Sequence, residues 1–157
     1  MVAFPELLDK FKHAVETGDV DTFLSIFTED AIYHDTTYGT FKGHAELKRL
    51  LADVFHQEAN DFKWEYADPV SDGNIGYAVF RFSVTSSHPN AAQRRALLFG
   101  CAQFTLRDGR IAQYKEWGNV AGTLLQAGVP DKVVVRFLQR EAGKLLEDPG
   151  FAAHLKN

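Results

Sequence analysis

The stretch AIYHDTTYGTFKG, residues 31–43, joins a strand signal to a polar turn. Its first four residues are apolar or aromatic and predict a short strand, and its two glycines mark the loop that follows. Because alternate side chains of a strand share a face, Tyr33 and Asp35 should point to one side. Ile32 and His34 should point to the other. A phenol beside a carboxylate can perform acid/base chemistry where that side is hollow; against packed core or open water, both are structural.

The composition indicates one globular domain. A chain of 157 residues, 45% of them hydrophobic, is long enough to bury a substantial core. Its 13 phenylalanines either fill that core or line a pocket for an apolar ligand. The net charge is −4 and no basic stripe is present, so nucleic acid is not an expected partner.

Cysteine use and the N-terminus bear on location. Cys101 is the only cysteine, so no disulfide can form within the chain, which fits a reducing compartment. The N-terminal segment MVAFPELLDKF is charged and amphipathic, unlike a signal peptide. No apolar run approaches the about 20 residues that a membrane span requires. We therefore expect a cytoplasmic protein with no membrane partner.

Helical spacing dominates the first third of the chain. Apolar residues recur at this spacing over 4–15, and Gly18 should end this first helix. The spacing returns further on, where Asp19 or Asp21 can cap a second helix. A third helix should follow Gly43. Its apolar residues are Leu47, Leu50, Leu51, Val54 and Phe55.

From residue 60 the period changes to two, which predicts a run of antiparallel strands. The expected strands are 62–66, 75–85, 95–106 and 111–117, with turns at 71–74 and 108–109 and a polar loop at 86–92. On the last strand, Tyr114 and Glu116 share a face. A helix capped by Asp131 should follow, with Pro149-Gly150 at its end.

This order of elements predicts an α+β fold. Helices that are segregated from an antiparallel sheet are typical of that class. A curved sheet wrapped around the N-terminal helices would leave a cone-shaped interior. We expect residues 1–125 to form this domain. Residues 126–157 should form a helical extension packed on the same domain or on a dimer partner.

Three segments resemble a known superfamily: GDVDTFLSIFTEDAIYHD (18–35), YGTFKGHAEL (38–47) and DGRIAQYKEW (108–117). They are similar to the nuclear transport factor 2-like superfamily and, within it, to the SnoaL-like polyketide cyclase group. The resemblance covers roughly residues 4–122. It implies a deep pocket for a small apolar molecule, and a homodimer. Members of the superfamily include ketosteroid isomerases, limonene-epoxide hydrolases, scytalone dehydratases, polyketide cyclases and binding modules without activity.

The resemblance also implies roles for single residues. Asp35 takes the position of the isomerase general base, and Glu116 that of a catalytic aspartate on the last strand. Tyr33 and Asp35 match a Tyr-x-Asn pair that orients water in the epoxide hydrolases. Phe11 stands where the isomerase has its oxyanion tyrosine, and Leu97 replaces the aspartate of an Arg-x-Asp pair of the hydrolases. These departures count against a ketosteroid isomerase and against epoxide hydrolysis.

Each candidate has a structural alternative. In an apolar pocket the pKa of Asp35 would rise toward that of a useful base, but the same residue could cap the turn after its strand. If Glu116 is buried, its carboxylate should be paired, protonated or functional. The structural alternatives are a sheet face that is open to water, or an ion pair with Arg81 or Lys63. Two carboxylates in unlike environments can hold opposite protonation states, so we expect Asp35 and Glu116 to be the catalytic acid and base. Tyr33 is expected to be catalytic as a hydrogen-bond donor to a substrate oxygen.

The residues expected to contact substrate are mainly rings, each of which could instead belong to the core: Phe11, Tyr38, Trp64, Phe80, Phe82, Phe104 and Tyr114, with His34. No His or Cys pair has metal-ligand spacing on a convincing element, and no phosphate loop or dinucleotide fingerprint occurs, so neither a metal nor a cofactor is expected. The sequence thus predicts a cofactor-independent cyclase, isomerase or dehydratase for a small, largely apolar carbonyl or hydroxyl compound. The alternative is a small-molecule-binding or protein-interaction module of the same fold.

Overall fold

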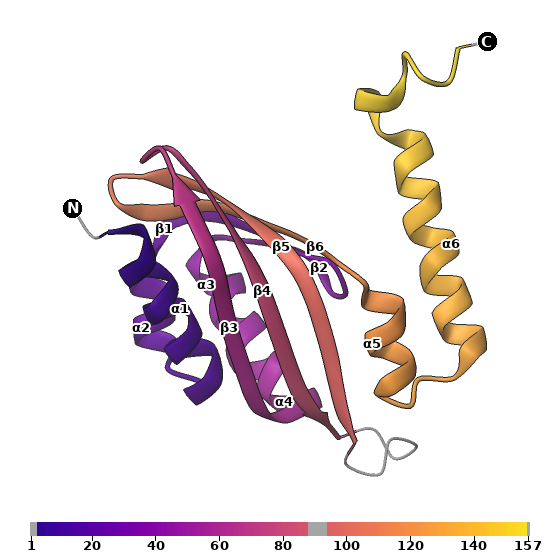
Figure 1. Cartoon of the computed structure of the whole chain (residues 1–157), viewed down its shortest axis with the longest axis horizontal. Helices are drawn as coiled ribbons and strands as arrows, with labels where there is room; N and C mark the ends of the chain where they lie inside the picture. Colours follow the sequence, from indigo (N-terminus) through magenta and orange to yellow (C-terminus); the bar gives the residue numbers. More distant parts are fainter. Residues whose placement is uncertain (1–2, 88–93, 157) are drawn as a thin grey trace.

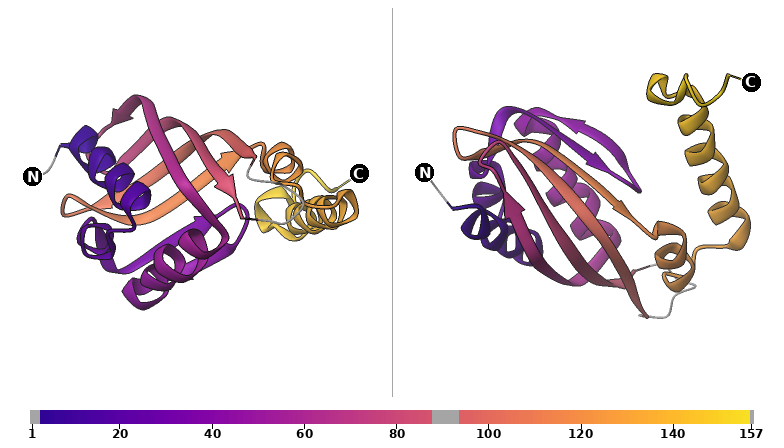
Figure 2. Two further views of the ribbon diagram at one scale, coloured as in Figure 1. Left: turned by 90° about the horizontal axis from the view of Figure 1, so that it is seen from below. Right: turned by 45° about the horizontal axis from the view of Figure 1, so that its top comes forward.

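Helices cover one face of a curved, six-stranded sheet in the computed structural model, which describes residues 3–87 and 94–156 (Figure 1). The strand order is β2-β1-β6-β5-β4-β3. The strands are β1 (Phe27–Asp35), β2 (Gly39–Lys42), β3 (Ala59–Ser71), β4 (Ile75–Ser86), β5 (Arg95–Arg107) and β6 (Arg110–Gly118). The left view of Figure 2 shows the sheet curling around the N-terminal helices, so the predicted α+β class is confirmed.

One strand pair departs from the predicted antiparallel pattern. β1 lies parallel to β6, with Tyr33 opposite Tyr114 and His34 opposite Lys115, while all other neighbours are antiparallel. Parallel neighbours require a long crossover connection. Here the connection between β1 and β6 contains strands β2 to β5 and the helices between β2 and β3. The pairing brings residues 31–35 against the last strand, which alternation within a single strand could not predict.

Tight turns join the remaining strands. Asp108 and Gly109 have φ of 54° and 74°, the left-handed conformation of a two-residue hairpin, as predicted. The side chain of Asp72 accepts hydrogen bonds in the predicted turn at 71–74. The expected loop after residue 35 is instead a hairpin, because Gly39–Lys42 pairs with β1 as β2. The predicted loop at 86–92 lies mostly outside the described residues; Ser86 itself ends β4.

The first two helices form as the spacing predicts. They are α1 (Phe4–Thr17) and α2 (Val20–Ser25). Gly18, at φ 72°, ends α1, and Asp19 caps α2 by accepting the Thr22 N–H at 3.0 Å. The apolar stripe of α1 is buried under the sheet, with Phe11 at its centre.

The third predicted helix is divided. It consists of α3 (Gly43–Arg49), a π-helical segment (Leu50–Phe55) and α4 (His56–Glu58). Its apolar residues Leu47, Leu50 and Leu51 are fully buried, as the spacing required. The wider π-helical turn was not visible in the sequence, because the same residues fit an α-helical stripe. π-Helical turns occur frequently at functional sites, and Phe55 at this one reaches the cavity described below.

Aromatic rings fill one end of the interior. Phe11 of α1 and the fully buried rings packed around it form a set that we call the ring cluster: Phe11, Phe23, Phe27, Tyr33, Phe104 and Tyr114. Phe11 contacts all of the others, and the Tyr33 and Tyr114 rings stack with their centroids 4.3 Å apart. These rings come from α1, α2, β1, β5 and β6, so the cluster holds helices and sheet together.

Two helices follow the sheet. α5 (Val120–Gln126), which the sequence did not predict, packs on β5: Leu97 donates its N–H to the Gln126 side chain and accepts the Thr123 hydroxyl at its carbonyl, both at 2.7 Å. α6 (Asp131–Glu147) precedes a 3-10 turn at Pro149–Phe151. Asp131 lies inside its first turn and does not cap it, because the capping position belongs to Pro130. Figure 1 and the right view of Figure 2 show α6 projecting from the domain.

Candidate active site

The parallel pair of strands places the two candidate carboxylates side by side. Tyr33 lies opposite Tyr114, and Asp35 and Glu116 each follow two residues later on the same faces of β1 and β6. Neighbouring strands are about 4.8 Å apart, so the two acidic side chains emerge next to each other. Thr36 connects them: it follows Asp35 and donates its hydroxyl to Oε1 of Glu116 at 3.1 Å. Two residues 81 positions apart thus share one site.

Glu116 is held in a buried hydrogen-bonded position. It is 7% exposed, and the Tyr114 hydroxyl donates to its Oε2 at 2.7 Å. Burial, and after it the negative charge of Asp35, raise the pKa of Glu116 to about 7, while the Tyr114 and Thr36 hydrogen bonds oppose the shift. The alternative of an open sheet face is wrong because Glu116 is buried, and Arg81 bonds Glu65 instead; no ion pair joins Glu116 to Lys63 in the part of the chain that the structure describes.

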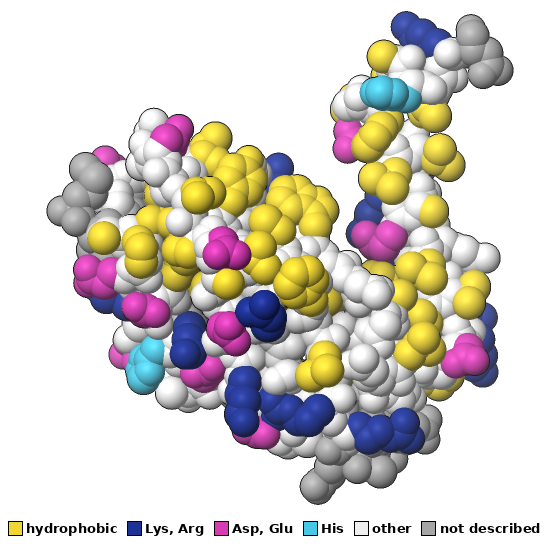
Figure 3. Space-filling model, in the orientation of Figure 1, with side chains coloured by type: hydrophobic (Ala, Val, Ile, Leu, Met, Phe, Trp, Pro, Cys, Tyr) yellow, Lys and Arg dark blue, Asp and Glu magenta, His cyan; other side chains and the backbone are white. Residues whose placement is uncertain are grey.

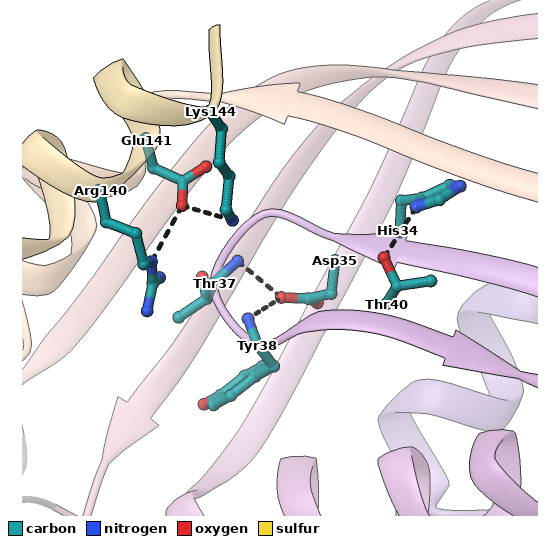
Figure 4. A network of polar contacts seen from close by, with 8 residues as sticks. All are labelled: His34, Asp35, Thr37, Tyr38, Thr40, Arg140, Glu141 and Lys144. Carbon is teal, nitrogen blue, oxygen red and sulfur yellow. Dashed lines mark hydrogen bonds and ion pairs between the residues drawn. The ribbon is translucent and has the colours of Figure 1, made fainter. Parts of the chain in front are cut away.

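Asp35 both caps a turn and faces the site. Its Oδ1 accepts the backbone N–H groups of Thr37 at 2.7 Å and Tyr38 at 2.8 Å, as Figure 4 shows. Burial nonetheless raises the pKa of Asp35 to about 6, although these two hydrogen bonds lower it. No described residue donates a hydrogen bond to the second oxygen, Oδ2. The turn-capping role and the site position therefore coexist in one residue.

A cavity of about 470 Å³ opens in front of the two carboxylates. Its wall is mainly apolar and comes from β1, the π-helical turn, β3, β4, β5, β6 and α5. The lining residues include Asp35 and Glu116, together with Tyr38, Phe55, Phe62, Trp64, Phe82, Val84, Ala96, Leu98, Val120, Thr123, Leu124 and Ala127. Three of the rings predicted to contact substrate, Tyr38, Trp64 and Phe82, are thus placed at the wall.

Other predicted contact residues do not reach the cavity. Phe11, Phe104 and Tyr114 belong to the ring cluster, and Phe80 is 1% exposed against Trp64. Tyr33 also lies in the cluster behind Asp35. The sequence placed these rings on the correct inward face, but it could not show that neighbouring rings would fill that part of the interior.

His34 lies away from the cavity. Its Nδ1 is 3.0 Å from the Thr40 hydroxyl, seen in Figure 4, and its Nε2 is 3.2 Å from the Gln113 amide. Burial and the charges of Lys115 and Lys42 lower its pKa. Its expected substrate contact is not supported by this placement, and the alternation of the strand explains why.

Some site residues were missed. Thr36 gave no signal, because a threonine in a turn is ordinary, and Tyr66 appeared only as an inward strand residue. Among the described residues, the hydroxyls of Tyr33 and Tyr66 and the Nε1 of Trp64 are buried without a hydrogen-bond partner. Unpaired buried donors are unfavourable. Of these three residues, only Trp64 lines the cavity; its Nε1–H is buried and lies toward the Tyr66 hydroxyl.

No metal site accompanies the carboxylates in the described ranges. No three His, Cys, Asp or Glu side chains gather there in a way that could hold an ion. The same part of the chain has no helix long and apolar enough to cross a membrane.

The family is decided by the match of residues 8–114 to the model of the SnoaL-like domain. The chain belongs to the SnoaL-like domain family. The resemblance noted in the sequence is therefore confirmed, although residues 115–157 lie outside the matched range. No curated protein sequence matches the chain significantly.

Solved structures show the same fold at low identity. A hypothetical protein from Catenulispora acidiphila with a ketosteroid isomerase-like fold, in complex with trimethylamine, has a TM-score of 0.72 at 15% identity, covering 82% of this chain and 96% of its own. An LEH-like epoxide hydrolase from M. tuberculosis has 0.60 at 18%, covering 82% and 92%. Hexachlorocyclohexane dehydrochlorinase LinA-type3 from Novosphingobium barchaimii has 0.64 at 17%, covering 74% and 84%. At these identities the likeness shows the fold alone, which hosts several chemistries.

Proposed function

We propose that the protein is a cofactor-independent acid/base enzyme of the cyclase, isomerase or dehydratase type. The observation that carries the proposal is that Asp35 and Glu116, two neighbouring carboxylates with raised pKa values, line the same apolar cavity. Perturbed acids in a cleft are typical of groups that transfer protons. Membership in the SnoaL-like domain family and neighbours that include an epoxide hydrolase and a dehydrochlorinase agree with such chemistry.

The two acids have different roles in this proposal. Asp35, with a pKa of about 6, loses its proton first near neutral pH and acts as the base through its free Oδ2. Glu116, with a pKa of about 7, keeps its proton longer and returns one to the substrate or orients water. Because both lie against one cavity, a substrate carbon and oxygen a few bonds apart can meet both groups.

The cavity wall favours a neutral, largely apolar substrate. The described lining contains no Lys, Arg or His, so it offers no counter-ion to an anionic group. Two carboxylates at its base would also repel an anion. A compact compound with a carbonyl or hydroxyl group fits the volume of about 470 Å³ and this charge pattern.

A binding module of the same fold is the second candidate. The observation in its favour is that Asp35 is tied to two backbone amides, which stabilise its turn without any catalytic role. In that case the cavity would hold an apolar ligand, and the acids would only orient it.

Turnover of small carbonyls, enones and epoxides by wild type, Asp35→Asn and Glu116→Gln tests the proposal. We expect each variant to lose at least about 100-fold in kcat on a substrate that wild type converts. Asp30→Asn on β1 and Glu65→Gln on β3 are matched controls, because both carboxylates are exposed and lie outside the cavity. Equal rates in all five proteins would refute the catalytic roles. Ligand-induced thermal shifts without turnover would favour the binding module.

A further inference from the structure

Five aromatic side chains form a continuous belt along the wall of the cavity. They come from the turn after β1, the π-helical segment, β3 and β4, and all of them line the cavity. Each ring contacts the next, with neighbouring centroids 4.7 to 6.4 Å apart. In order along the wall, the members of this ring belt are Tyr38, Phe55, Phe62, Phe82 and Trp64.

The ring belt begins beside the acid pair, Asp35 and Glu116. The backbone N–H of Tyr38 donates to Oδ1 of Asp35 at 2.8 Å, so the first ring belongs to the turn that holds this carboxylate. The second oxygen, Oδ2, accepts no hydrogen bond from the described residues, and Glu116 lines the same cavity. One ligand can therefore contact both an acceptor oxygen with spare capacity and a row of aromatic rings.

No cation of the described chain completes the acid pair. Among the described residues that line the cavity there is no Lys, Arg or His. The arginines of the neighbouring strands pair elsewhere, Arg81 with Glu65 and Arg95 with Asp61. Figure 3 shows Lys and Arg side chains spread over the outer surface of the domain on the face in view. Because an ionised carboxylate that is removed from water needs a positive partner, the acid pair is one half of an ion pair.

The other titratable groups that face the acids are phenols. The Tyr114 hydroxyl donates to Glu116, and the hydroxyls of Tyr33 and Tyr66 interact with the same carboxylate through its charge. Burial raises the pKa of all three phenols above its ordinary value, so they stay neutral. The acids have pKa values of about 6 and about 7, and only their own protons balance their charge. Above pH 7 both are ionised in an apolar cavity.

We propose that the cavity also binds small organic ammonium ions, each a protonated amine on an apolar body, in competition with a neutral substrate. The ammonium N–H donates to Oδ2 of Asp35, and its charge lies beside both carboxylates in place of the proton that they otherwise hold. The apolar body contacts the ring belt, whose rings attract a cation through their π systems. This inference rests on the proposed function for a cavity that both acids face, and it does not depend on turnover.

Isothermal titration calorimetry of the full chain with phenethylamine, phenethyl alcohol and phenylacetate tests the preference for a cation. The three probes share one apolar body and differ in charge. At pH 8 the protonated amine should bind at least about 10-fold more tightly than the alcohol, and the anion should bind most weakly. At pH 5 this preference should largely disappear, because both acids then carry protons. Near pH 7 the amine should release protons to the buffer as it binds, since a nearby cation favours the ionised acids.

Variants separate the acids and the rings from the rest of the chain. Asp35→Asn/Glu116→Gln removes both charges and should bind the amine and the alcohol equally at pH 8. The matched control, Asp30→Asn/Glu65→Gln, removes two exposed charges outside the cavity and should keep the wild-type preference. Phe82→Leu keeps an apolar side chain but removes a ring of the belt, and it should lower the preference at least about 3-fold. Circular dichroism reports whether each variant is folded.

Several results would overturn the inference. They are equal affinity of the wild-type chain for the amine and the alcohol at pH 8, no binding of any probe, or a preference that Asp35→Asn/Glu116→Gln retains. An unchanged preference in Phe82→Leu would overturn the role of the ring belt. If the double variant does not fold, the pH dependence of the wild-type preference decides. A chain that turns over a substrate without preferring the amine fails only this test, whereas an inactive chain that prefers the amine supports the inference and fails only the proposed reaction.

Discussion

The two ends of the interior are built from the same strands and differ in what fills them. At one end β1, β5 and β6 contribute Tyr33, Phe104 and Tyr114 to the ring cluster, all of them fully buried. At the other end the sheet contributes Trp64 and Phe82 together with the smaller Val84 and Ala96, and a cavity of about 470 Å³ remains. Large rings occur at both ends, so which part of the interior is hollow depends on how the rings pack together and not on their presence alone.

The carboxylates lie at the boundary between these ends. β1 passes from Tyr33 to Asp35, and β6 from Tyr114 to Glu116, in two residues each. The rings behind the acids exclude water from one side, and the cavity receives a ligand on the other. This arrangement explains why burial raises both pKa values while the groups stay within reach of a ligand.

The largest effect should come from emptying the filled end. Phe104→Ala removes a fully buried ring from the cluster and should lower the free energy of unfolding by about 4 kcal/mol. Phe82→Ala removes a half-buried ring beside the existing cavity and should lower it by about 2 kcal/mol or less. Urea unfolding of the two variants measures the difference. Equal losses would mean that the two ends are packed alike.

Adding volume should have the opposite asymmetry. Ala102 and Ala96 lie six residues apart on the inward face of β5; Ala102 is fully buried between Ala78 and Glu116, and Ala96 lies at the cavity wall. Ala102→Leu should destabilise the fold by about 2 kcal/mol through overpacking, whereas Ala96→Leu should cost less than about 1 kcal/mol. Chemical unfolding gives both values. A larger loss for Ala96→Leu would show that the cavity wall cannot yield.

The boundary acids should make stability depend on pH. Burial raises the folded-state pKa of Glu116 to about 7 from its ordinary 4.5, so the folded chain binds this proton more tightly than the unfolded chain. The resulting stabilisation is complete below pH 4.5 and is lost as the pH rises through 7. Glu116→Gln should therefore be more stable than wild type by about 2 kcal/mol at pH 8, with no gain at pH 4. Thermal unfolding at both pH values checks this, with Glu65→Gln as the exposed control.

A small effect is expected where α5 closes the hollow end. Gln126→Ala removes the side-chain acceptor of the Leu97 N–H, a bond of 2.7 Å near the surface. The expected loss is about 0.5–1 kcal/mol. Gln139→Ala, on the exposed side of α6, is the comparison and should change the unfolding free energy less. If neither variant changes the free energy of unfolding, α5 is held by its apolar contacts alone.

Local patterns predicted the elements well and their long-range pairing poorly. The period of two placed Tyr33 with Asp35 and Tyr114 with Glu116, and Gly18, Asp19 and the 108–109 turn gave correct boundaries because each rule acts within a few residues. The parallel contact of β1 with β6 depends on residues about 80 positions apart, which no local pattern records.

The position of the cavity in the interior could not be predicted from the sequence either. Phe82 and Phe104 look alike in the sequence, yet one borders the cavity and the other is enclosed in the ring cluster. Which rings are enclosed depends on the summed volume of neighbours from five elements. Thr36 was missed for a similar reason, since its role exists only when Glu116 is brought beside it.

The most direct test of the account is a pH titration of the Asp35 and Glu116 carboxyl carbons by NMR. The account predicts that the pair titrates with apparent pKa values of about 6 and about 7, both well above the ordinary range for exposed acids. Asp35→Asn should lower the value of Glu116, because the neighbouring charge is removed. Titration of both groups near pH 4 would contradict the account, since it would mean that water reaches the two carboxylates freely.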